Sequence, residues 1–109
     1  MKAKPANILL EKHLRELGLD FCREFQVAPK RKWRFDYYLA PTTNIAIEIE
    51  GSVYTNGRHT RGKGFEADCI KYNTAAMMGY RVLRFSTGQI LRGEAKQFLA
   101  EWLGREGGR

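Results

Sequence analysis

The sequence contains few cysteines and histidines and no long apolar run. Cys22 and Cys69 are its only cysteines, which excludes a disulfide scaffold, and the two histidines, His13 and His59, do not complete a zinc site. Both thiols are interpreted as reduced side chains of a cytoplasmic protein. No apolar segment approaches the length of a membrane span, and the apolar region of a signal peptide is missing after residues 1–5. We therefore expect a cytoplasmic protein without a membrane segment.

Low-complexity segments are missing as well, and the length of 109 residues predicts one domain over 1–109 with a frayed tail at 104–109. The net charge of +7, from 19 Lys and Arg against 12 Asp and Glu, attracts polyanions. Solubility alone would explain a basic composition, but here the basic residues are clustered, which favours DNA as a partner. Those expected to contact DNA phosphates are Lys30, Arg31 and Lys32 before one strand and Arg58, Arg61 and Lys63 in a later loop.

The spacing of apolar residues predicts an α/β protein with helices on the faces of a mixed sheet. Helices are expected at 6–17, 65–78 and 93–103, and strands at 21–27, 32–39, 44–50 and 80–85. Asn7 is a candidate cap of the first helix. The stripe expected to bury the second helix is Phe65, Cys69, Tyr72 and Ala76. The last strand follows a crossover helix and should lie parallel to a central strand.

Three carboxylates, those of Asp36, Glu48 and Glu50, lie inside two predicted strands, where buried negative charge is unfavourable. Alternation along 32–39 places Asp36 on the face opposite Trp33, Phe35, Tyr37 and Leu39. A turn near Thr42 then brings Asp36 opposite Glu48 across a hairpin. Like charges at opposed positions repel unless a cation lies among them, and a divalent ion such as Mg²⁺ prefers carboxylate ligands. The pattern therefore predicts a metal site.

Four motifs follow one another along nearly the whole chain. They are Glu11 on the first predicted helix, Asp36 on a strand, the run Ala46-Ile47-Glu48-Ile49-Glu50-Gly51, and the run Gly79-Tyr80-Arg81-Val82-Leu83-Arg84-Phe85. In this order they resemble the PD-(D/E)xK nuclease superfamily, and most of all small endonucleases related to the very-short-patch repair endonucleases. The resemblance implies a restriction-endonuclease-like fold, with an αβββαβ core and a C-terminal helix.

The resemblance also implies a set of metal ligands, namely the carboxylates of Asp36, Glu48 and Glu11 and the carbonyl oxygen of Ile49. The expected ion is Mg²⁺, with Mn²⁺ able to substitute. Charged residues on a helix are ordinarily only solvated, so the residues alone leave Glu11 open between surface and site.

Glu50 stands where the superfamily usually has its catalytic lysine. In some members a lysine of the following helix takes that role, which makes Lys71 the candidate here; from its spacing alone, Lys71 is equally a surface partner of Asp68. Glu50 itself is interpreted as a general base, a ligand or an orienter of water. His59 is expected to donate a proton to the leaving oxygen, and Arg84 to reach the same face and contact DNA.

We therefore expect a Mg²⁺-dependent DNA endonuclease that is nicking or selective for DNA structure. A non-catalytic nucleic-acid-binding module on the same fold and an RNA nuclease remain the alternatives. A homodimer would allow both strands to be cut, although no segment indicates an interface.

Overall fold

The computed structural model describes residues 4–39, 42–51 and 62–107. Its elements are α1 (Pro5–Glu16), β1 (Phe21–Gln26), β2 (Arg34–Leu39), β3 (Ile45–Glu50), α2 (Lys63–Met77), β4 (Arg81–Ser86), α3 (Thr87–Leu91) and α4 (Glu94–Gly107). The strands form one sheet in the order β1-β2-β3-β4. β2 pairs antiparallel with both β1 and β3, and β4 lies parallel to β3, as the crossover helix predicts.

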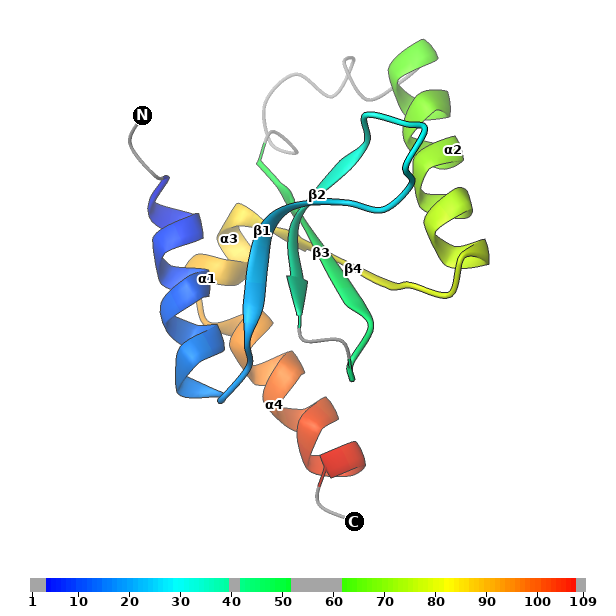
Figure 1. Ribbon diagram of the computed structural model, residues 1–109. Coiled ribbons are helices and arrows are strands. Elements are labelled where there is room, and N and C mark those ends of the chain that lie inside the picture. The colour runs from blue at the N-terminus through cyan, green and yellow to red at the C-terminus, as the bar shows by residue number, and fades with distance from the viewer. Residues whose placement is uncertain (1–3, 40–41, 52–61, 108–109) are drawn as a thin grey trace.

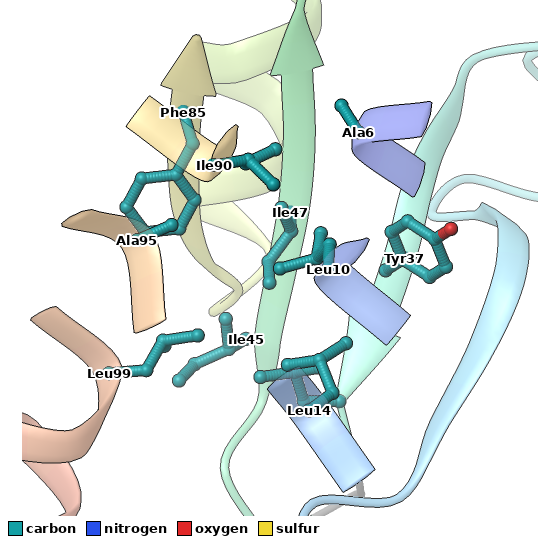
Figure 2. Packing of buried hydrophobic residues seen from close by; sticks show 11 residues of the cluster. Ala6, Leu10, Leu14, Tyr37, Ile45, Ile47, Phe85, Ile90, Ala95 and Leu99 are labelled. Atoms are coloured by element: carbon teal, nitrogen blue, oxygen red, sulfur yellow. The ribbon is translucent and has the colours of Figure 1, made fainter. Parts of the chain in front are cut away.

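The helices cover the two faces of the sheet unequally (Figure 1). Helices α1, α3 and α4 lie on one face, over the larger hydrophobic cluster (Figure 2), whose fully buried members include Leu10, Leu14, Ile47, Ile90 and Leu99. Helix α2 lies on the other face, over a smaller cluster that contains Phe35, Ala46 and Ala75. The mixed α/β class and the C-terminal helix predicted from the sequence are both confirmed.

The β1–β2 hairpin changes faces along its length, which the strict alternation expected for 32–39 does not predict. Tyr37 and Leu39 belong to the cluster beneath α1, whereas Phe35 belongs to the cluster beneath α2. Across the hairpin, Glu24 has a φ of 55°, a left-handed conformation that interrupts the extended strand. The carboxylate of Asp36 lies on β2 between the two aromatic side chains that point to different faces.

Helix α2 buries only part of the stripe expected from its sequence, because Tyr72 packs against the smaller cluster while the ends of the stripe are exposed. Phe65 is 56% exposed and Ala76 is exposed as well, whereas Ala75 is fully buried. Lys71 contacts the sheet one turn before Ala75. The apolar content of the helix is therefore a poor guide to its inner face, because the sheet presents carboxylates as well as apolar side chains.

Helix ends differ from the expectation at three places. Lys4 is the N-cap of α1 and Pro5 occupies its first position, so Asn7 lies in the first turn and is not the cap. Helix α3 was not expected; Ser86 and Gln89 form its capping box, a pattern that the sequence contains. Helix α4 continues to Gly107, where a frayed tail was expected from residue 104.

Candidate active site

Asp36 and Glu48 lie on neighbouring central strands. Glu48 faces α2, whose Lys71 donates to it, whereas Asp36 lines a cleft beside the start of α1 and α3. The β2–β3 ladder pairs Tyr37 with Ile47 and Tyr38 with Ala46, the register expected from the turn. At Asp36 the pairing of backbones gives way to a side-chain contact, because Asp36 Oδ2 accepts a hydrogen bond of 2.7 Å from the backbone N–H of Ile49. Burial raises the pKa of Asp36, against the effect of this hydrogen bond.

Glu48 is the most perturbed carboxylate of the site. Burial raises its pKa to about 7, and the negative charge of Asp36 adds to the effect. Its Oε2 accepts from Lys71 Nζ at 3.3 Å, while its Oε1 is buried and has no hydrogen-bond partner among the residues described. A buried acceptor without a partner is unfavourable, so this oxygen is poised for a cation or a proton.

Lys71 reaches the carboxylates from α2, as its candidate role requires. Its ammonium donates to the carbonyl oxygen of Arg34 at 2.7 Å and to Glu48, and lies 4.5 Å from the ring centre of Phe35. The side chain is only 12% exposed. The alternative of a surface pair with Asp68 does not describe this position, because Lys71 points inward to the sheet.

Glu50 is held by two side chains. Its Oε2 accepts from the Tyr72 hydroxyl at 3.2 Å and from Arg84 Nε at 2.9 Å. Arg84 therefore reaches the same face as the carboxylates and pairs with Glu50, and it also stacks over the Tyr72 ring at 4.3 Å. Its predicted contact with DNA would have to coexist with this ion pair.

Glu11, a metal ligand in the set implied by the resemblance, has both carboxylate oxygens engaged in hydrogen bonds. Arg23 binds both of its oxygens at 2.7 Å, and the Tyr37 hydroxyl donates to Oε2 at 2.6 Å. These hydrogen bonds, with that from Arg23 the strongest, lower the pKa of Glu11 to about 2. A carboxylate with its oxygens so occupied would have to give up strong hydrogen bonds to bind a metal.

A cleft of about 320 Å³ opens beside Asp36. Its walls come from the start of α1, the ends of β2 and β3, and α3, and its lining residues include Asn7, Asp36, Ile49, Gly51 and Thr87. Among the described residues, Glu48 does not line this cleft. The cleft gives a ligand access to Asp36 from solvent.

The residues present fit a metal ion that takes only one or two carboxylate ligands from the protein and keeps water as its other ligands. In the described ranges, no three Asp, Glu, His or Cys side chains come close enough to hold one ion together. Mg²⁺ commonly binds through one or two carboxylates and keeps several waters. The unpartnered Glu48 Oε1 and the raised pKa values of Asp36 and Glu48 suit such an ion, because added positive charge would relieve both.

The basic residues expected to contact DNA are described only in part. Lys30, Arg31 and Lys32 are exposed on the β1–β2 connection, where Arg31 lies 4.8 Å over the Trp33 ring. Arg58, His59 and Arg61 lie outside the described residues, and Lys63 begins α2. The roles assigned to these residues stay predictions.

Sequence reasoning missed Asn7, Arg23, Tyr37 and Tyr72 as members of the polar networks. Tyr37 and Tyr72 were expected to be core aromatics, and their rings are indeed packed. Only their hydroxyl groups distinguish them from Phe, and a hydroxyl gives no periodic signal in a sequence.

Comparison with known proteins was made on the sequence and on the fold. No protein-family model and no curated protein matches the sequence. Among solved structures, the chain is similar to the catalytic domain of the homing endonuclease I-Bth0305I, with a TM-score of 0.69 and 20% identity over 93% of this chain and 95% of that chain. At this identity the likeness shows a shared fold. Within the described residues, no helix has the length and apolar character to cross a membrane.

Proposed function

We propose that the protein is a metal-dependent endonuclease that hydrolyses phosphodiester bonds of DNA. The observation that carries the proposal is the pair Asp36 and Glu48, two desolvated carboxylates. Glu48 has a buried oxygen without a partner among the described residues, and Asp36 lines an open cleft. Supporting it are the net charge of +7 and a fold shared with a domain that is named as the catalytic part of a homing endonuclease. The PD-(D/E)xK relationship belongs to the same proposal.

Asp36 and Glu48 would hold Mg²⁺ or Mn²⁺, with the Ile49 carbonyl as the further protein ligand. The bound ion would polarise the phosphate and lower the pKa of a water. Asp36 is already oriented for this role by the Ile49 N–H on Oδ2, which leaves Oδ1 as the ligand atom. No ligand role is proposed for Glu11, since its oxygens are occupied by Arg23 and Tyr37.

Lys71 would stabilise the negative charge that develops on the phosphate during hydrolysis. Its ammonium is fixed by the carbonyl of Arg34 and by Glu48, so little side-chain reorganisation is needed at the moment of reaction. Glu50 would accept a hydrogen bond from the attacking water through Oε1, because Tyr72 and Arg84 both hold Oε2. His59 is proposed as the donor to the leaving oxygen.

The test is cleavage of supercoiled plasmid and branched DNA, with Mg²⁺ or with EDTA, by wild type, Asp36→Asn and Glu48→Gln. We expect Mg²⁺-dependent nicking by wild type and a loss of about 100-fold or more in both variants, because each removes a charge that holds the ion. Glu101→Gln is the matched control, since Glu101 is an exposed carboxylate on α4. Its rate should equal that of wild type.

Three results would count against the proposal. Intact DNA with the wild type would refute it, and tight, salt-sensitive DNA binding without cutting would identify a non-catalytic module. Equal cutting by Asp36→Asn would remove Asp36 from the mechanism. Cleavage of RNA in place of DNA, in a parallel reaction, would reassign the substrate.

A further inference from the structure

Asn7 shares the cleft with Asp36, although nothing in the motifs of the chain assigns it a role. It lies in the first turn of α1 and is partly exposed. Its side-chain Nδ2 donates to the Tyr37 hydroxyl oxygen at 3.2 Å. Glu11, one helical turn further along α1, does not line this cleft.

A chain of hydrogen bonds fixes the orientation of the Asn7 amide. Glu11 is ionised and can only accept, so both Arg23 and the Tyr37 hydroxyl donate to it. The single proton of Tyr37 is thereby used, and its oxygen must accept from its other neighbour. The end of the Asn7 amide that faces Tyr37 is therefore the nitrogen, which leaves the carboxamide oxygen on the opposite side of the group.

The chain of hydrogen bonds is anchored in the core. The Tyr37 ring is 1% exposed, and it packs edge to face against Phe21 with 5.5 Å between ring centres. Figure 2 shows the ring inside the larger cluster, with its hydroxyl oxygen pointing away from the apolar side chains. Because the ring cannot move without disturbing the core, the hydroxyl is a fixed reference point for Asn7.

We propose that the Asn7 carboxamide oxygen accepts a hydrogen bond from a water of the hydration shell of the cation held at Asp36. Tyr37, Glu11 and Arg23 are positioning residues that fix the orientation of the Asn7 amide. The inference rests on the proposed function, because it presupposes the cation. An ion bound by two carboxylates keeps several waters, so acceptors for those waters contribute to its binding.

The test is a titration with Mn²⁺, in which binding is measured from the electron paramagnetic resonance signal of the free ion. It needs no catalytic turnover. We compare wild type, Asn7→Ala, Tyr37→Phe and the double variant. Loss of a group that orients a metal's surroundings weakens affinity 10–100-fold, and we expect about tenfold for Asn7→Ala because the contact passes through water. Asn73→Ala, an exposed position on α2, makes the same chemical change outside the cleft and should bind as wild type does.

The double variant separates positioning from a merely structural role. If Tyr37 acts through Asn7, Tyr37→Phe alone weakens Mn²⁺ binding by less than Asn7→Ala, and adds nothing in the Asn7→Ala background. A further loss in the double variant would overturn the positioning role. Unchanged affinity in Asn7→Ala would overturn the inference and leave the proposed function standing, whereas a wild type that binds no Mn²⁺ would overturn both.

Discussion

Glu48→Gln should stabilise the metal-free protein at alkaline pH while it abolishes cleavage. The pKa of Glu48 rises from 4.5 to about 7 in the folded state, so folding disfavours the ionised side chain. A carboxyl group with a raised folded pKa leaves stability intact below pH 4.5, and the protein loses stability as the pH rises from 4.5 to 7. Glutamine keeps the shape of the side chain without this charge.

The magnitude follows from the pKa. A tenfold change in proton affinity corresponds to about 1.4 kcal/mol, which would give about 3 kcal/mol for the full rise. The side chain is 21% exposed, so solvent screens part of the effect. The quantity compared is the free energy of unfolding of Glu48→Gln minus that of wild type. We expect this difference to be about 2 kcal/mol larger at pH 8 than at pH 5.

The assay is urea unfolding in EDTA at pH 5, 6, 7 and 8, followed by the fluorescence of Trp33 and Trp102. The pH dependence of the difference is the quantity that matters, because any change in packing from the substitution is the same at every pH. A difference that stays constant from pH 5 to pH 8 would refute the raised pKa of Glu48 in the folded state. Added Mg²⁺ at pH 8 should raise the urea concentration at the unfolding midpoint of wild type and leave the midpoint of Glu48→Gln unchanged.

Three further predictions concern the core and the charged groups. Leu10→Ala should lower the free energy of unfolding by about 2–5 kcal/mol, measured in urea at pH 7, because the side chain is fully buried. Glu11→Gln should lower it by about 2 kcal/mol at pH 7, and this difference should shrink as the pH falls from 4.5 towards 2, the folded pKa of Glu11; an undiminished difference at pH 2.5 would contradict the ion pair with Arg23. Lys71→Met should slow single-turnover DNA cleavage by about 100-fold with little change in DNA affinity at fixed salt, and a wild-type rate would remove Lys71 from the mechanism.

Much of the fold is predictable because apolar periodicity is local. Alternation along 44–50 places Ile45, Ile47 and Ile49 on one face and Glu48 on the other, and the structure keeps that arrangement. The same alternation is wrong at Phe35, because a left-handed residue on the neighbouring strand changes the face that the hairpin presents. A period of two can be read from a strand only while the strand stays extended.

The candidate site, like the fold, could be predicted from the sequence only in part. A sequence reports that Asp36 and Glu48 are charged residues in apolar strands, and the turn length gives their register. It does not report which cation meets which anion, since any of 19 Lys and Arg side chains could approach. The structure pairs Lys71 with Glu48 and Arg84 with Glu50, across elements far apart in the chain.

The sequence by itself determined the α/β class, the parallel last strand and the register that brings Asp36 close to Glu48, because each depends on local periodicity, on turn length or on the hand of a crossover connection. Only the tertiary structure decided that Arg23 and Tyr37 donate hydrogen bonds to Glu11. It also decided that Asn7, one turn earlier on α1, lines the cleft. The physical reason is that hydrogen-bond partners are chosen by distance in space. Asn7 and Glu11 lie one turn apart on the same helix, so the helix alone does not determine which of them lines the cleft. The strands packed against α1 determine it.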